Sequence, residues 1–243
     1  MKTVQAHISQ KQLSTSLHPL FARLDGNAAL AEVLPFFSGL SFWVVAQQDL
    51  FREVDGKMQD LKLRKVARFY RAVAAGQDKW FMNDVVKVEG RTPDASELFG
   101  PRHAVARDAA FAVMAEAKAA SSDAERLVVL QALEAANYLL VEAVASYFER
   151  MNVTEPLQFF SAAHLDAMAE HEVLRKQIDG IVAGLEMSEA ERASACARVD
   201  RIFAAFRAVL DGSELTCQRA ARRPAFHMVQ RLSASESGAL RAA

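Results

Sequence analysis

The chain has 243 residues, of which 51% are hydrophobic and 24% charged, and its formal net charge is −1. This composition is typical of a globular protein with a sizeable core, and so small a charge supplies no field to attract nucleic acid or an anionic membrane. The two cysteines, Cys196 and Cys217, argue against a disulfide framework or a cysteine-based zinc site and favour a reducing, cytoplasmic location.

We expect helices along nearly the whole chain, because alanine is abundant and only ten glycines and six prolines interrupt it. In chain order the expected helices span residues 9–24, 28–54, 59–75, 78–89, 95–119, 123–150, 155–184 and 188–211, with a shorter one near 214–232. No linker or internal repeat divides the chain. Residues 1–232 are therefore expected to form one all-α domain, a bundle of about seven to nine helices, and residues 233–243 a disordered tail.

The N-terminal segment has no unbroken apolar core, so we expect no signal peptide. The most apolar run, Val33 to Ala46, is interrupted by Pro35 and Gly39 and is shorter than the roughly 20 residues of a membrane-spanning helix. It predicts a buried helix. Its aromatic residues Phe36, Phe37, Phe42 and Trp43 are expected in the core, with some of them lining a central pocket.

Capping residues mark several helix starts. Asp94, Ser122 and Ser188 each stand three residues before a glutamate, the pattern of a capping box. The two long helices expected at 123–150 and 155–184 are joined by a tight turn, so we expect them to pack as antiparallel neighbours.

The helix at 123–150 carries Glu134 and Glu142 in an otherwise apolar stretch. Glu134 shares a broad face with Tyr138, and burying its carboxylate would be costly without a cation, a hydrogen bond or a metal. One alternative partner for Glu134 is Arg107. Glu142 is expected to be structural or solvated.

In the next helix the stretch "HLDAMAEHE" places His164 and His171 seven residues apart. Residues at this spacing are rotated by only about 20° on an α-helix, so the two imidazoles share a face. Met168, one turn from each, stands where a third side chain would complete a metal site, but a thioether is a poor ligand for iron in oxygen chemistry. The alternative is a hydrogen-bonded histidine pair at a helix interface, with Met168 filling the core.

Two earlier stretches contain further candidates, "DKWFMNDVVKVEG" with Asp84 and Glu89, and "GPRHAVARDAA" with His103. Together these parts, between Leu17 and Phe206, resemble the heme-oxygenase-like superfamily of helical proteins. "HLDAMAEHE" resembles the ligand helix H-x-x-x-D-x-x-H-E of its diiron oxidases at every functional position except Met168. The resemblance implies a bundle with a central pocket and the iron ligands Glu89, His103, Glu134, His164 and His171.

The substitution of Met168 for the aspartate of the family pattern implies one weakly held iron in place of a diiron centre. A rival alignment of "WFMNDVVKVEG" with the segment W-x-x-F-L-x-D-L-x-x-L-G of other superfamily members makes Asp84 the notable carboxylate and implies a protein without the metal site. Heme oxygenase activity itself is less favoured, because no glycine cluster accompanies His18, the candidate axial ligand.

We predict a non-heme iron-dependent oxidase or oxygenase that acts on a small organic substrate in a central pocket, which Met168, Tyr138, Asp84 and Trp43 help to line. One alternative is a metal-free or non-catalytic protein of this fold that binds a small ligand. Another is a cofactor-free oxidase resembling pyrroloquinoline-quinone synthase. The only further partner that fold analogy suggests is a second copy of the chain, in a homodimer.

Overall fold

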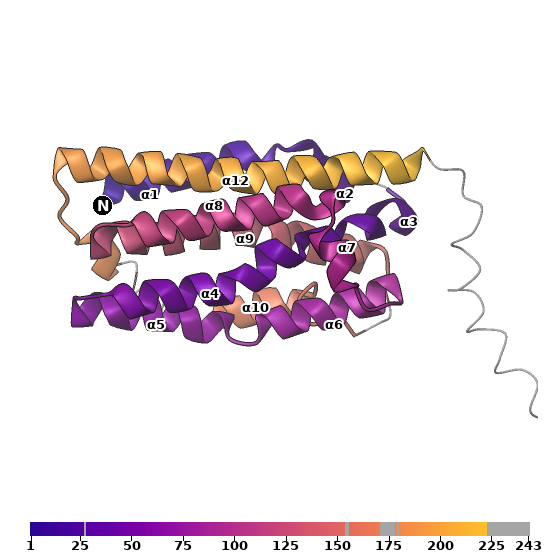
Figure 1. Cartoon of the computed structure of the whole chain (residues 1–243), viewed down its shortest axis with the longest axis horizontal. Helices are drawn as coiled ribbons and strands as arrows, with labels where there is room; N and C mark the ends of the chain where they lie inside the picture. The colour runs from indigo at the N-terminus through magenta and orange to yellow at the C-terminus, as the bar shows by residue number, and fades with distance from the viewer. Residues whose placement is uncertain (27, 154–155, 171–177, 179, 223–243) are drawn as a thin grey trace, which may run out of the picture.

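Helices make up all the regular secondary structure of the residues described by the computed structural model, which are 1–26, 28–153, 156–170, 178 and 180–222. Their order is α1 (Lys2–Ser16), α2 (Pro19–Asp25), α3 (Leu30–Val33), η1 (Leu34–Phe36), η2 (Ser38–Leu40), α4 (Ser41–Lys57), α5 (Leu61–Ala74), α6 (Gln77–Glu89), α7 (Ala95–Phe99), η3 (Pro101–His103), α8 (Ala104–Ala119), α9 (Asp123–Arg150), α10 (Ala162–Glu170) and α12 (Glu189–Ala221). The η elements are short 3-10 helices. The predicted all-α class is confirmed for this part of the chain (Figure 1).

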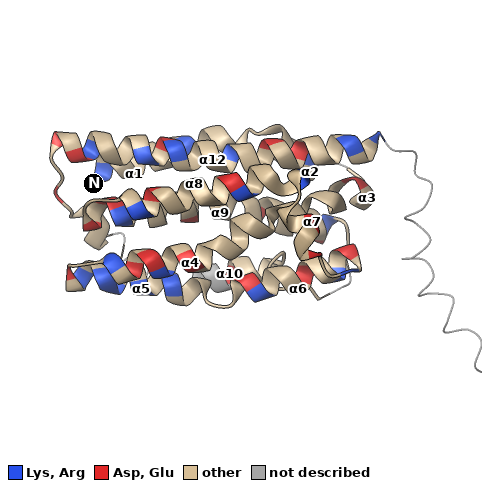
Figure 2. Ribbon diagram, viewed as in Figure 1, with Lys and Arg blue, Asp and Glu red and all other residues tan. Residues whose placement is uncertain are grey.

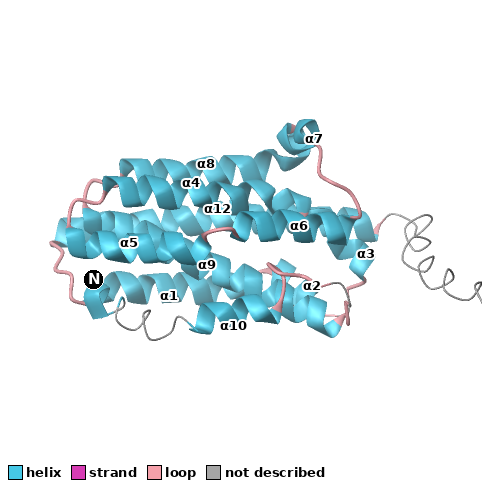
Figure 3. Cartoon of the chain, turned by 90° about the horizontal axis from the view of Figure 1, so that it is seen from below, coloured by secondary structure: helices cyan, strands magenta, loops and turns pink. Residues whose placement is uncertain are grey.

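Helix α9, 28 residues long, runs through the middle of the bundle. It packs against α1, α2, α4, α5, α8, α10 and α12, and the turned view in Figure 3 shows it between α5 and α1. Its apolar residues, among them Leu133, Ala136 and Val144, are almost completely buried. A polar side chain on the inner side of α9 therefore lies near the centre of the molecule.

The ends of α9 were predicted to the residue, because the signals that set them are local. The Ser122 side chain accepts a hydrogen bond from the Glu125 backbone N–H at 3.2 Å. At the start of α12, Ser188 and Glu191 form the full capping box, in which each side chain accepts from the other residue's backbone N–H.

Proline explains most of the differences between the expected helices and the observed ones. The helix expected at 9–24 begins at Lys2 and is divided before Pro19, where the His18 Nδ1 atom caps α2 by accepting from the Leu20 N–H at 3.1 Å. Gly100 and Pro101 likewise separate α7 from α8. Proline has no N–H to donate and fits the first turn of a helix, so it begins a new helix at both places.

Two further differences lie towards the C-terminus. The helix expected at 155–184 begins only at Ala162, for a reason that involves the functional site. In contrast, α12 continues through Gly212 to Ala221, where we expected a break after residue 211. An isolated glycine costs a helix only about 1 kcal/mol, and the buried neighbours Val209 and Leu210 hold this part of α12 against the bundle. The tail expected at 233–243 lies outside the described residues.

A buried ionic network joins α8, α9 and α12. Arg198 on α12 is 4% exposed and donates to the Glu116 carboxylate at 2.6 Å and to the Glu125 carboxylate at 3.3 Å. Glu125 also accepts from the hydroxyls of Ser121 and Ser194. These bonds outweigh the effect of burial, which acts to raise the pKa of Glu125, and they lower that pKa to about 2.

The lowered pKa of Glu125 predicts a loss of stability in acid. A carboxyl group whose pKa is lower in the folded state than in the unfolded state stabilises the fold at higher pH, and this contribution disappears as the pH falls from about 4.5 towards 2. We expect Glu125 to contribute about 2–3 kcal/mol at neutral pH. Urea unfolding of the wild type and of Glu125→Gln between pH 2 and pH 7 checks this. The difference between the two proteins should shrink towards pH 2, and a constant difference would contradict the assignment.

Two helical stretches, Leu30–Lys57 and Asp123–Arg150, are long and apolar enough to cross a membrane by length and composition alone. This is weak evidence, because the core helices of soluble proteins pass the same test. The most apolar part of each stretch is largely buried inside the bundle, 56% of it in the first stretch and 61% in the second. Figure 2 shows charged residues along the outer helices α5 and α12, and nothing in the described part of the chain conflicts with a soluble protein.

Candidate functional site

Asp84 organises the segment that leads into α10. Its side chain lies on α6, is fully buried, and accepts hydrogen bonds from three successive backbone N–H groups, those of Gln158, Phe159 and Phe160, at 2.7–3.0 Å. Burial raises the pKa of Asp84, although the three N–H donors act to lower it. Because these N–H groups point to Asp84, residues 158–160 do not form a helix, and α10 begins after them.

The same segment positions His164. The His164 Nδ1 atom lies 2.8 Å from the carbonyl oxygen of Phe159. A carbonyl oxygen can only accept, so Nδ1 carries the proton, and Nε2 of the neutral imidazole has a free lone pair. Burial lowers the pKa of His164, which favours this neutral form, and the ring stands edge-on to Trp80. His164 Nε2 is buried and has no hydrogen-bond partner among the described residues.

His164 and Glu134 line the same small cavity, which we call the inner cavity and which has a volume of about 20 Å³. A cavity of this size holds one water molecule or one ion, and it is too small for an organic substrate. The lining residues come from α4, α5, α6, α9, the segment before α10, and α10 itself: Gln47, Phe51, Tyr70, Val73, Ala74, Gln77, Glu134, Asn137, Val141, Phe159 and His164.

A larger depression, which we call the outer groove, lies between α1, α5 and α9 and has a volume of about 360 Å³. This volume lies within the range of small-molecule sites. Tyr70 and Glu134 line both the outer groove and the inner cavity, so they form the boundary between the two. The groove's polar side chains are mostly uncharged: Gln5, Ser9, Gln12, Tyr70, Gln131 and Tyr138, with Glu134 the one charged group among its described lining residues.

Trp43 acts on the inner cavity through Asn137. The Trp43 indole N–H donates to Asn137 Oδ1 at 2.9 Å, and the amides of Asn137 and Gln47 donate to each other at 2.8 and 2.9 Å. Trp43 is 2% exposed and packs on Phe206, so it belongs to the core and supports the cavity wall from behind. Sequence reasoning placed Trp43 near the pocket, but it missed Gln47, which no spacing or charge pattern distinguishes from a surface glutamine.

The structure does not bring Glu89 and His103 to the inner cavity. Gln77, at the first turn of α6, lines that cavity, and Glu89 lies twelve residues further along the helix, or about 18 Å at 1.5 Å per residue. The Glu89 carboxylate accepts from the Ser38 N–H at 3.0 Å. His103 lines a different cavity, at the start of α8. One iron with ligand bonds of about 2 Å could not be shared by all these residues.

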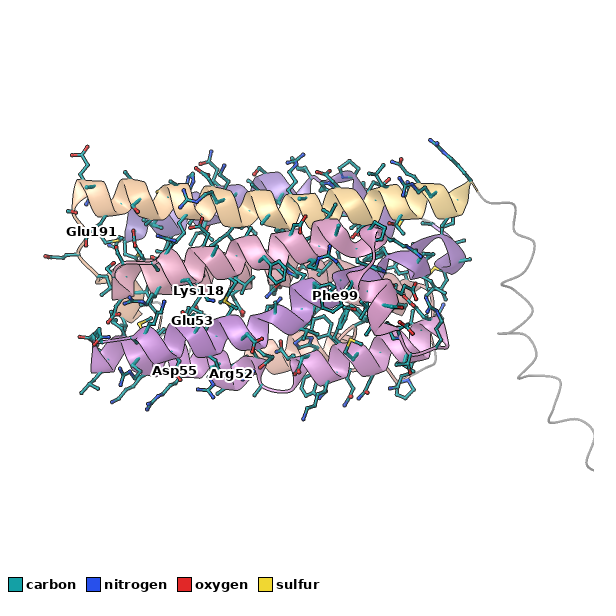
Figure 4. The ribbon with its side chains drawn as sticks, in the orientation of Figure 1. Arg52, Glu53, Asp55, Phe99, Lys118 and Glu191 are labelled. Atoms are coloured by element: carbon teal, nitrogen blue, oxygen red, sulfur yellow. The ribbon has the colours of Figure 1, made fainter. Side chains whose placement is uncertain are left out.

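The remaining candidates have definite positions as well. Tyr138 lines the outer groove, and Asp84, predicted to line the pocket, instead supports it from behind. Glu142 is exposed, as expected. Arg107, considered as a partner for Glu134, donates instead to the Phe99 carbonyl at 2.7 Å, and Figure 4 labels Phe99 at the end of α7 beside α4.

His171 lies outside the described residues, as does the side chain of Met168. Within the described part of the chain, no three or more His, Cys, Asp and Glu side chains form a group able to hold a metal ion. Glu134 and His164 are therefore two candidate ligands of an incomplete set.

No family model matches the chain, and no curated protein matches its sequence, so neither comparison adds a ligand.

Proposed function

We propose that the protein is a non-heme iron-dependent oxidase or oxygenase of the heme-oxygenase-like type, with Glu134, His164 and His171 as the residues that hold the iron. The observation that carries the proposal is the His164 imidazole. Its Nδ1–H is fixed by a backbone carbonyl, its buried Nε2 has no hydrogen-bond partner among the described residues, and the residue lines a cavity of ion size together with Glu134. Metal-binding histidines commonly have their second nitrogen held in this way.

Imidazole and carboxylate groups are suitable ligands for non-heme iron, which, when bound, would supply the activation of O₂. The chain's own residues would do the rest. Asp84 and the Phe159 carbonyl orient His164, and Phe51, Val73 and Val141 give the inner cavity apolar walls. The outer groove would hold the small organic substrate, with Tyr70 and Glu134 at the boundary where it meets the inner cavity. In this proposal the protein is cytoplasmic.

Anaerobic loading with Fe(II), followed by desalting and elemental analysis, tests this function. We expect the wild type to retain up to one iron per chain, and His164→Ala and Glu134→Gln to retain at least tenfold less. His7→Ala is a matched control, because His7 pairs with Asp200 on the surface of the bundle and lines neither the cavity nor the groove.

Met168→Asp restores the carboxylate of the family pattern and is expected to increase the iron content. If neither the wild type nor Met168→Asp retains iron, the iron-dependent function is wrong. Iron in Met168→Asp alone would also overturn it, because the natural chain would then have lost the metal.

A metal-free ligand-binding protein is the second candidate, and the outer groove is the observation that favours it. Gln131 lines this groove, and its Oε1 atom is buried without a hydrogen-bond partner in the described part of the chain. The chelator-treated protein would then bind small polar molecules, detectable by ligand-observed NMR, and Gln131→Leu should weaken that binding while leaving iron retention unchanged.

A further inference from the structure

A second cavity lies at the N-terminal end of α8, between this helix, η1 and α12, and has a volume of about 40 Å³. We call it the α8 cavity. Its volume is twice that of the inner cavity, so it has room for a small polyatomic ion. It is separate from the proposed iron site, because the two cavities share no lining residue within the described part of the chain.

His103 is a buried residue in the wall of the α8 cavity, and one of its ring nitrogens has no partner among the described residues. The residue is 3% exposed, and its Nε2 atom has no hydrogen-bond partner among the described residues. A buried imidazole nitrogen left unpaired is unfavourable. His103 lines the α8 cavity, so its ring is positioned to bond to a small ligand held there. Burial and the neighbouring Arg102 both lower the pKa of His103.

The start of α8 adds backbone donors. His103 is the N-cap residue of this 16-residue helix, and its side chain does not cap the first turn. Val105 and Ala106, both in that turn, line the cavity. The N–H of Ala104 donates to the Pro101 carbonyl, because η3 runs directly into α8. The N–H groups that follow it at the start of the helix, together with the helix dipole, favour an anion.

The charge of the rim indicates the same kind of ligand. Arg102 lines the cavity, and its guanidinium donates to the Pro35 carbonyl at 3.2 Å, which holds it at the edge. A guanidinium at this position repels a metal cation, which explains why His103 is poorly suited to the metal-ligand role that the resemblance implies. On the α12 side, the hydroxyls of Ser213 and Thr216 donate to carbonyls of their own helix. Their oxygen lone pairs remain able to accept a bond from a ligand O–H.

We propose that the α8 cavity binds a small oxyanion of the carboxylate type, such as formate or bicarbonate, through Arg102, the His103 imidazole and backbone N–H groups in the first turn of α8. Gly212 faces the cavity from α12. A β-carbon at Gly212 would lie 3.7 Å from the Val105 side chain, an ordinary contact, so alanine is tolerated there while taking up part of the cavity.

The test is an NMR titration of the imidazole ¹⁵N signals with sodium formate and, separately, sodium bicarbonate. At each point of the titration, sodium gluconate makes up the total sodium concentration to a constant value. Gluconate is too large to enter the cavity. The His103 signal is identified by its absence in His103→Gln. In the wild type we expect a saturable shift of the His103 signal, and in Arg102→Gln and Gly212→Ala at least tenfold weaker binding.

Arg207→Gln is the matched control, because it removes one exposed positive charge from α12 without touching the α8 cavity, and it should bind as the wild type does. Gly212→Ala should fold at least as well as the wild type, since alanine is the better helix former. The absence of a saturable shift in the wild type would overturn the proposal. So would wild-type affinity in both Arg102→Gln and Gly212→Ala.

Discussion

Replacement of Asp84 with alanine is expected to lower the free energy of unfolding by about 3–5 kcal/mol. The substitution leaves the backbone N–H groups of Gln158, Phe159 and Phe160 buried without an acceptor, and each such group costs about 1–3 kcal/mol. Urea unfolding followed by tryptophan fluorescence measures the loss, and Trp80, beside His164, reports on this region.

Asn83→Ala is the control for this experiment, because Asn83 is the exposed neighbour of Asp84 on the same helix and its loss should change stability by less than about 0.5 kcal/mol. Asp84→Asn keeps one carbonyl oxygen as an acceptor and should fall between the wild type and Asp84→Ala. A loss below about 1 kcal/mol in Asp84→Ala would show that water replaces the carboxylate at these N–H groups, and the anchoring role would be wrong.

Asp84 also acts on the candidate site, as a positioning residue. It holds the segment whose Phe159 carbonyl fixes the His164 tautomer, so a change at Asp84 should reach His164 through the backbone. In Asp84→Asn we therefore expect weaker iron retention together with an altered His164 imidazole signal in the metal-free protein. A residue that merely stabilised the fold would leave that signal unchanged in protein that remains folded.

Local signals explain which parts of the fold could be predicted from the sequence. The start of α9 depends on Ser122 and Glu125, three residues apart, and was predicted correctly. The start of α10 depends on Asp84, which contacts Gln158 across 74 positions of the chain. No local pattern reveals such a contact, so the helix was predicted to begin too early.

The residues predicted for the candidate site fall into two groups, those that line one cavity and those that lie elsewhere. Glu134 and His164 were chosen from a carboxylate in an apolar helix and a histidine with helical spacing, and they line one cavity. Glu89 and His103 were added by the resemblance alone, and they lie elsewhere because α6 carries Glu89 well away from Gln77. The resemblance fixed the order of these residues along the chain, but the position of each in space depends on helix lengths and packing.

Replacement of Arg198 with alanine is expected to be comparably severe, with a loss of about 3–5 kcal/mol at neutral pH. Arg198 and Glu125 are almost completely buried, at 5% side-chain exposure each, and removal of the arginine leaves Glu125 without its charge partner. Glu116 is less affected, because it keeps the exposed Arg201. Thermal or urea unfolding measures the loss. Arg201→Ala is the matched control on the same helix, and as its side chain is 54% exposed it should cost at most about 1 kcal/mol.

The dependence of this loss on pH separates the charge of Arg198 from its packing. Without Arg198 the pKa of Glu125 should rise from the value of about 2 that it has in the wild type, but only in part, because the hydrogen bonds from Ser194 and Ser121 lower that pKa more than Arg198 does and remain in the variant. The difference in free energy of unfolding between the wild type and Arg198→Ala should therefore shrink as the pH falls from about 4.5 to 2, because Glu125 becomes protonated in both proteins. Arg198→Ala combined with Glu125→Gln should regain a large part of the loss at neutral pH, since no uncompensated charge remains at position 125. A loss that stayed constant with pH, and that Glu125→Gln did not relieve, would show that Arg198 stabilises the bundle through its packed aliphatic stem and its bonds to helix carbonyls.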